Sequence, residues 1–214
     1  MRQLLFLFLI CFSHSLLADS PLTSCNFSGA YTQNKYVSRA KEKGLDKKVL
    51  KFLGKDKSDD VIKIAIINEL GWNNKGTLST FENYLIEKRS GVSSATFDML
   101  RGVGIDEFSD TEETKKLSSD DLVCWAYLQA MDDYFDPSKA IAAASLAYDR
   151  EKESMAHAAV YGLIMAQIVF DQDWCMVYET GTQIFEQTTY TKSILSKEAI
   201  TMIMDYLNLY KEYC

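Results

Sequence analysis

The 214-residue chain is acidic, with 30 aspartate and glutamate residues against 23 lysine and arginine residues and a formal charge of −7. Hydrophobic residues make up 47% of it and aromatic residues 12%. This composition is that of a globular protein and excludes a disordered chain. A chain of this length can bury a substantial core without a structural metal. The acidic balance, with no interleaving of aromatic and basic residues, argues against nucleic-acid binding.

The N-terminal segment has the three parts of a secretory signal peptide. Arg2 supplies a positive charge, Leu4–Phe12 is an unbroken apolar run, and Ala18 offers a small residue for cleavage. The apolar run is shorter than the ~20 residues that span a bilayer. We therefore expect a signal peptide over residues 1–18, cleaved near Ala18, and a protein that is periplasmic or secreted. Residues 19–214 should form a single helical domain, whose formal charge is −8 because Arg2 is removed.

The cysteine count changes with this processing. Cys11 leaves with the signal peptide, and Cys25, Cys124, Cys175 and Cys214 remain. An even number of cysteines in an exported protein indicates two disulfides. Cys175 begins one predicted helix and Cys214 ends the last, so the two meet if these helices form an antiparallel hairpin. We therefore predict Cys175–Cys214 and Cys25–Cys124 disulfides, the second of which would tether the N-terminal arm.

The first half of the predicted domain, residues 26–117, contains short helices separated by glycines. No segment alternates between apolar and polar residues with a period of two, so the sequence gives no sign of a sheet. A capping box, in which serine and glutamate side chains bond the free N–H groups of the first turn, is predicted at Ser79–Glu82. Ser58 is the expected N-cap of another helix. The expected helices cover residues 30–43, 46–53, 59–70, about 80–90 and 94–101.

The second half, residues 118–214, is expected to be the tighter core. Its helices are predicted at residues 120–135, 137–148, 154–170, 173–187 and 196–213, and the third of these is apolar nearly all round. Trp125–Tyr127 and Ala159–Tyr161 begin two similar patterns that are offset by about 34 residues, the period of helical-hairpin repeats. The repeat consensus is poorly matched. With or without repeats, we expect an all-α antiparallel multi-helix stack or bundle, braced by disulfides.

One short pattern suggests a metal site. Asp132, Asp133 and Asp136 form a DDYFD sequence that resembles the aspartate-rich motif of terpenoid synthases, which are helical enzymes that hold magnesium against a diphosphate. Carboxylate oxygens are the ligands that such cations prefer. The second metal motif of that family is missing here, and the chain is shorter than those enzymes. The alternative is that Asp136 caps the helix that starts at Pro137, and the three aspartates are only weak candidates for metal ligands.

The sequence offers little else for catalysis. His157 is the only histidine that survives processing, and it lies in the apolar segment 154–170. We expect it to be a core residue that is hydrogen-bonded to a neighbour. The sequence contains no nucleophile-elbow, zinc-protease or phosphate-loop motif. No catalytic residue and no cofactor are therefore predicted.

Charge is unevenly distributed along the chain. Residues 35–57 contain nine basic residues against three acidic ones, and residues 106–121 contain seven acidic residues against two lysines. These runs would give a bipolar surface, whose basic end meets an anion, a lipid or an acidic partner and whose acidic end meets a basic partner. The alternative is that each run is only the solvent-exposed face of its helices and has no partner.

The sequence thus favours an exported, acidic, non-enzymatic helical protein that binds another protein. One concrete form is an immunity or inhibitor protein that neutralises a toxin or hydrolase in the same compartment, whose partner would be basic. A small exported hydrolase or a metal-dependent enzyme using Asp132, Asp133 and Asp136 is the first alternative. A carrier of a small apolar ligand held between helices is the second. We expect no nucleic-acid partner and no stable membrane insertion.

Overall fold

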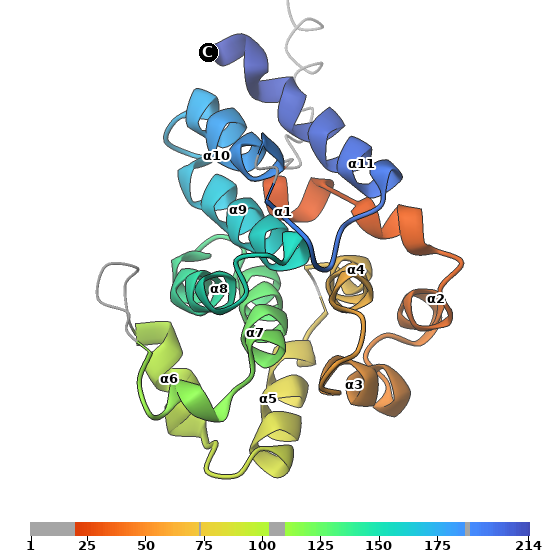
Figure 1. Ribbon diagram of the computed structural model, residues 1–214, viewed down its shortest axis with the longest axis vertical. Coiled ribbons are helices and arrows are strands. Elements are labelled where there is room, and N and C mark those ends of the chain that lie inside the picture. The colour runs from red at the N-terminus through yellow and green to blue at the C-terminus, as the bar shows by residue number, and fades with distance from the viewer. Residues whose placement is uncertain (1–19, 73, 103–109, 187–188) are drawn as a thin grey trace, which may run out of the picture.

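The computed structural model describes residues 20–72, 74–102, 110–186 and 189–214, and within them the protein is all-α (Figure 1). This confirms the predicted fold class. The predicted signal peptide, residues 1–18, lies outside the described residues. Among the described helices, none combines the length and the apolar character that crossing a bilayer requires.

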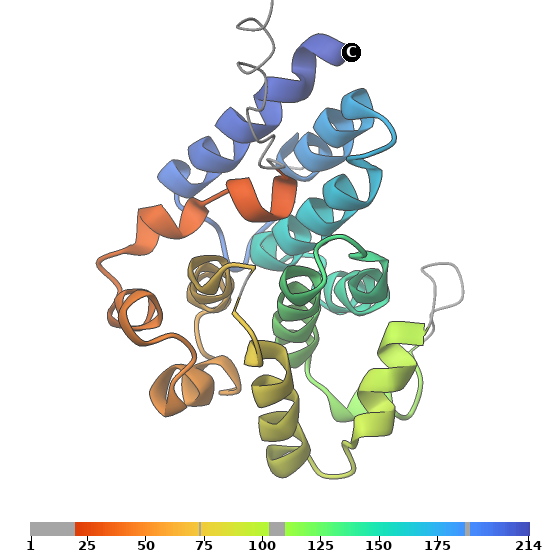
Figure 2. The same ribbon diagram turned by 180° about the vertical axis from the view of Figure 1, so that it is seen from behind.

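The elements follow one another with short connections. The first half contains α1 (Pro21–Ser24), η1 (Phe27–Tyr31), α2 (Lys35–Lys43), α3 (Lys47–Leu53), α4 (Asp60–Leu70), α5 (Thr77–Lys88) and α6 (Ser94–Gly102). The second half contains η3 (Thr114–Lys116), α7 (Ser119–Asp132), α8 (Ser138–Arg150), α9 (Met155–Val169), α10 (Trp174–Glu186), α11 (Lys197–Leu207) and η4 (Asn208–Tyr213). Figures 1 and 2 show α10, α11 and the C-terminus at one end of the molecule and α5 and α6 at the other, with α2 and α3 on one side of the half that lies away from the C-terminus.

Three helices form the centre of the core. Twelve of the 15 residues of α9 are buried, as the apolar pattern predicted. Eleven of the 14 residues of α7 and nine of the 11 residues of α4 are buried as well. The centre is therefore an assembly of α4, α7 and α9, and not one buried helix alone. Helix α9 also approaches α10 closely at Gly162, since a Cβ atom there would lie 1.6 Å from Cδ1 of Ile184.

The two similar sequence patterns of the second half differ in the structure. Tyr127 of α7 is fully buried, and its hydroxyl accepts a hydrogen bond from Nδ2 of Asn68 at 3.0 Å. Tyr161, the equivalent residue of α9, is half-buried and stacks on Tyr148, with ring centroids 5.7 Å apart. The two similar sequence patterns therefore place their tyrosines in different environments.

Two helix starts differ from their predictions. The N-cap of α4 is Asp59, whose Oδ1 accepts from the backbone N–H of Val61 at 3.0 Å, and it is not Ser58. The predicted capping box at Ser79–Glu82 is wrong, because α5 begins earlier, after Gly76 in the left-handed region (φ 82°). The carboxylate of Glu82 is held elsewhere, by Arg101 and by the indole N–H of Trp125.

A capping box does begin α7. Ser118 Oγ accepts from the backbone N–H of Asp121 at 3.1 Å, and Asp121 Oδ2 accepts from the backbone N–H of Ser118 at 3.0 Å. Nε of Arg89 donates a hydrogen bond to the same buried carboxylate at 2.8 Å. Asp121 therefore fixes the start of α7 and joins it to the end of α5 at the same time.

One predicted disulfide is present and the other is wrong. Cys175 and Cys214 are bonded, with their Cα atoms 4.8 Å apart. Cys25 and Cys124 are free and buried. The N-terminal arm is held by hydrogen bonds instead, since Nδ2 of Asn68 donates both to the backbone carbonyl of Cys25 and to the hydroxyl of Tyr127, each at 3.0 Å. Tyr127 lies one helical turn beyond Cys124, so this contact, and not a disulfide, joins the arm to α7.

We expect thiol labelling to distinguish these two arrangements. Burial raises the pKa of the Cys25 and Cys124 thiols, so thiolate is scarce and reagents cannot reach the sulfurs. For the chain without residues 1–18, iodoacetamide should modify no cysteine in the native, non-reduced protein and two after denaturation without reductant. Intact-mass spectrometry counts the modifications, and full reduction before labelling gives the control with four. A denatured, non-reduced chain without a reactive thiol would restore the Cys25–Cys124 bond.

Candidate functional site

A buried ionic cluster joins the three central helices. Asp60, Asp120 and His157 occupy the first turns of α4, α7 and α9, and their ligand atoms lie within 4.8 Å of one another. Lys63 lies among them with its side chain 0% exposed. Its Nζ is 2.5 Å from Oδ2 of Asp120 and 3.6 Å from Oδ1 of Asp60. Burial opposes the charge on this lysine, but the neighbouring carboxylates of Asp120 and Asp60 outweigh it and raise the pKa of the ammonium group.

His157 is the core residue that the sequence predicted. Its Nδ1 lies 3.3 Å from the carbonyl oxygen of Ala147, so Nδ1 carries the proton and donates it. Its Nε2 faces Asp60 Oδ2 at 3.8 Å without a hydrogen bond. Burial lowers the pKa of His157, although Asp60 and Asp120 act in the opposite direction, and burial raises the pKa of Asp60. The direction for His157 favours a neutral imidazole.

The cluster has the donor atoms of a metal site but already contains a cation. Asp60, Asp120 and His157 offer two carboxylates and an imidazole, yet the Lys63 ammonium lies against both carboxylates. A divalent ion there would meet this positive charge at close range. The arrangement is not a hydrolytic triad either, because the Ser193 hydroxyl donates to Asp60 (3.0 Å) and not to the histidine. Sequence reasoning missed the cluster because its members come from distant segments.

The hollows on the described part of the protein include two of more than about 300 Å³. One, of about 470 Å³, lies between the start of α4 and residues 193–196, beside Asp60. The other, of about 310 Å³, lies between α8, α9 and α10, beside Tyr148 and Tyr161. Both have the size of a small-ligand site. The second, which Met165 and Ile184 help to line, is the one that a carrier of a small apolar ligand would use.

The predicted aspartate motif does not form one set of ligands. Helix α7 ends at Asp132, so Asp133 and Asp136 lie beyond it and do not continue its face. Both are ion-paired with Lys139, at 2.7 and 3.2 Å. Asp136 also accepts a hydrogen bond from the hydroxyl of Ser138. The lysine therefore neutralises two of the three weak candidates, and Asp132 remains exposed to solvent.

The described acids of the acidic run, residues 106–121, form ion pairs with basic residues of the same chain. Asp110 binds Arg150 at 2.6 Å, and Asp120 binds Lys63. Asp121 binds Arg89 in the same way. Glu112 and Glu113 pair with the two lysines of their own segment. The described acids of this run therefore do not form the acidic end of the bipolar surface that the sequence suggested.

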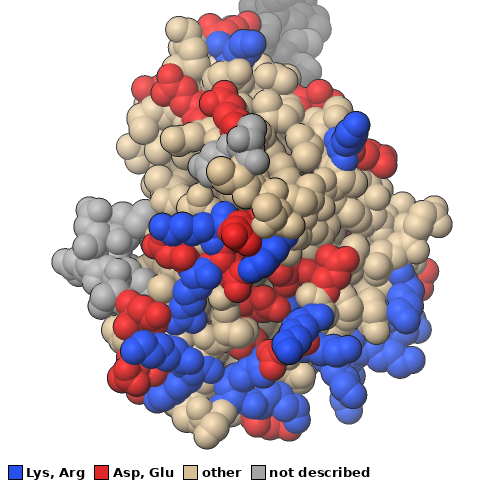
Figure 3. Space-filling view, in the orientation of Figure 1, with Lys and Arg blue, Asp and Glu red and all other residues tan. Residues whose placement is uncertain are grey.

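The basic run, in contrast, remains available. In α2, α3 and the following turn, Arg39 pairs with Asp46, and Lys41 approaches Glu69 at 3.7 Å. The other lysines of the run are exposed and form no ion pair with a described residue. We call them the lysine face: Lys35, Lys43, Lys47, Lys48, Lys51, Lys55 and Lys57. Basic side chains gather in Figure 3 where Figure 1 shows α2 and α3.

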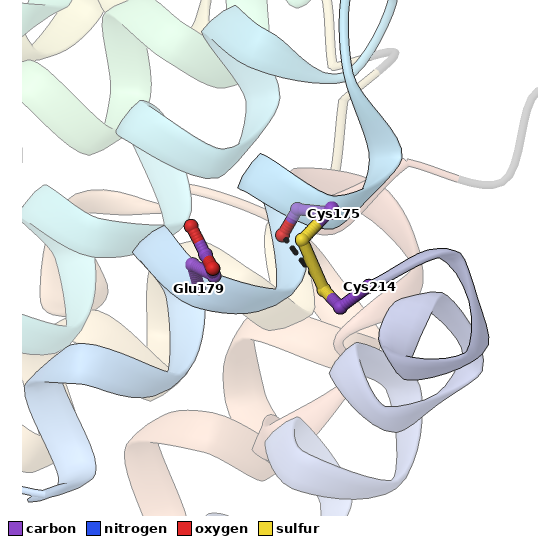
Figure 4. A group of neighbouring side chains, drawn as sticks. All are labelled: Cys175, Glu179 and Cys214. Carbon is purple, nitrogen blue, oxygen red and sulfur yellow. Dashed lines mark hydrogen bonds between the residues drawn. A yellow bond between two sulfur atoms is a disulfide. The ribbon is translucent and has the colours of Figure 1, made fainter.

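A second surface feature lies at the end formed by α10 and the C-terminus (Figure 1). Trp174 and Met176 of α10 are 46% and 45% exposed, and Tyr213 of η4 is 50% exposed. The rings of Trp174 and Tyr213 meet edge to face, with centroids 4.6 Å apart. The adjacent disulfide fixes α10 against the chain end (Figure 4). We call Trp174, Met176 and Tyr213 the C-terminal face. The sequence analysis identified the neighbouring Cys175 and Cys214 but not this face.

Figure 4 also shows Glu179 one turn beyond Cys175 on α10. Glu179, Cys175 and Cys214 have the proximity of metal ligands. The two sulfurs are bonded to each other, so neither is a thiolate that could bind a metal. The sulfurs therefore fix the position of the C-terminal face and supply no chemistry.

No protein-family model matches the chain. Comparison with curated proteins and with solved structures gives no significant match either.

The buried cluster leads to a stability prediction. Lys63→Met leaves Asp120 without its partner, and breaking a buried ion pair in this way costs about 3–5 kcal/mol. The same change at Lys115, whose pair with Glu112 is exposed, should cost less than about 1 kcal/mol. The double variant Lys63→Met/Asp120→Leu should recover part of the loss, because only Asp60 is then left without its cation. Urea unfolding measures all three, and equal costs for the two lysine variants would contradict a structural role.

Proposed function

We propose that this protein is exported and acts without catalysis by binding another protein through its C-terminal face. The observation that carries the proposal is the exposed aromatic pair Trp174–Tyr213 beside a disulfide. Tryptophan and tyrosine are the side chains most often responsible for binding energy at protein interfaces. Each combines a large apolar area with few rotatable bonds, so little entropy is lost on binding.

Pre-organisation supports this use of the face. The disulfide joins α10 to the last residue of the chain, so the two aromatic rings are held together before a partner arrives. A surface that is already ordered avoids the cost of ordering side chains and loops during association. Large apolar side chains at such a fixed position therefore favour recognition of a partner.

The charge around the face indicates the chemistry of the partner. From residue 171 to the C-terminus the chain has seven acidic residues and three lysines, and none of these acids forms an ion pair with a described residue. An aromatic centre with an acidic surround complements a basic protein and accelerates its approach. The acids nearest to the face along the chain are Asp171, Asp173, Glu179 and Glu212, with Asp205 further along, whereas Glu186 and Glu198 lie at the far ends of α10 and α11.

The predicted signal peptide gives this binding a context. A basic partner would meet the protein after export, in the periplasm or outside the cell. An immunity or inhibitor protein that occludes an exported toxin or hydrolase is the concrete form that we propose. In that case, stoichiometric addition of the protein should abolish the activity of the partner.

Capture from extract of the source organism tests the aromatic centre. We expect the chain without residues 1–18 to retain a basic protein, and Trp174→Ala/Tyr213→Ala to weaken the purified complex by about 2 kcal/mol or more, roughly 30-fold in Kd. Calorimetry measures the affinity, and circular dichroism checks that the variant is folded.

Ile86→Ala is the matched control, since Ile86 is an exposed apolar residue of α5. It should leave the affinity unchanged. An acidic partner, or a basic one that binds both variants equally well, would refute the proposal.

The acidic surround gives a separate kinetic prediction. Asp171→Asn/Glu179→Gln/Glu212→Gln should slow association with the captured partner at low salt, with a smaller effect on dissociation, because rim charges act mainly on the encounter. Stopped-flow measurements across a salt series test this. The control removes the same charge at Glu87, Asp98 and Glu112, which pair with nearby basic side chains. Equal slowing by both triple variants would mean that only the net charge matters.

A further inference from the structure

We propose that the lysine face binds the surface of an anionic lipid bilayer, so that the protein lies peripherally on a membrane. This inference uses a surface different from the C-terminal face and does not depend on the proposed protein partner. It rests on the charge, the side-chain chemistry and the position of α2 and α3.

The first argument is the amount of uncompensated charge. Seven exposed ammonium groups lie on two short helices and the turn that follows. Within residues 35–57, Asp46 is paired with Arg39 and Asp56 with Arg89, which leaves Glu42 as the acidic residue without an ion pair among the described residues. Clusters of four to eight basic residues are typical of binding to anionic lipids, where each contributes about fivefold to affinity. Such a cluster is notable in a chain whose formal charge is −7.

The second argument distinguishes a lipid from an acidic protein. Protein interfaces are enriched in aromatic residues and arginine and depleted in lysine. Here every unpaired cation is lysine, and the one arginine of α2 is engaged by Asp46. The aromatic residues Tyr36 and Phe52 stack on each other, with centroids 4.1 Å apart, and are half-buried. Hydrated point charges without aromatic anchors match mobile phosphate headgroups better than a fixed protein surface.

The third argument is geometric. Lys51 lies four residues after Lys47 and three after Lys48, so each of the two shares one side of α3 with Lys51. Val49 and Leu53 of the same helix are fully buried, so the lysine side is the outward one. α2 and α3 lie on one side of the half of the molecule away from α10 and the C-terminus (Figures 1 and 2). A bilayer that attracts the lysine face would repel the acidic end, so the C-terminal face would point away from the membrane.

Vesicle sedimentation tests the proposal with the chain without residues 1–18. We expect binding to phosphatidylcholine vesicles that contain phosphatidylglycerol, no binding to phosphatidylcholine alone, and loss of binding at high salt. Lys47→Gln/Lys48→Gln/Lys51→Gln should weaken binding on the order of 100-fold, from about fivefold for each lysine. The three side chains are exposed, so the variant should keep its fold, which circular dichroism verifies.

The matched control removes the same charge elsewhere. Lys115→Gln/Lys116→Gln/Lys152→Gln changes three lysines that pair with acidic neighbours and lie outside the lysine face. It should bind vesicles like the unaltered chain. Equal loss in both triple variants, or no binding to phosphatidylglycerol vesicles, would overturn the proposal. Binding to soluble polyglutamate but not to vesicles would also overturn it, in favour of an acidic protein partner.

Discussion

A cation buried at the junction of three helices is the constraint on which this fold depends. Lys63 has no contact with solvent, so its charge must be balanced by the two aspartates of the cluster. Those aspartates stand in the first turns of α4 and α7, where the partial positive charge of the helix also stabilises them. The first turns of the central helices must therefore meet at one point, and His157 brings α9 to the same place.

The surfaces of the molecule follow from this centre. Asp121, the residue after the buried partner of Lys63, binds Arg89 and so fixes α5. Much of the acidic run is thus used inside the scaffold. The lysine face has no ion-pair partner among the described residues, and neither have the acids of α10, α11 and η4. The acids in the middle of the chain are used in ion pairs, and unlike charges remain free on two different surfaces of the molecule.

Local patterns in the sequence predicted the helices well, but they did not predict the contacts between residues that are distant in sequence. Glycines and apolar periodicity located α2 to α11 to within a few residues at most ends, and the ends of α10 and η4 predicted the Cys175–Cys214 bond. The predicted box at Ser79–Glu82 failed because Glu82 is held by Arg101 and Trp125, which are distant in sequence. The Cys25–Cys124 bond failed because Asn68 tethers the arm. Spacing in a single sequence does not reveal such partners.

The position of the disulfide separates the assembly of the core from oxidation. The bond closes a loop between residues 39 apart, and the loop-entropy model gives it about 4 kcal/mol. The loop lies wholly after α9, so α4, α7 and α9 come together without any covalent link. Loss of the bond would loosen the contact between α10 and the chain end while the buried ionic junction stays closed. The redox state of the compartment would then control the aromatic surface, and packing alone would control the fold.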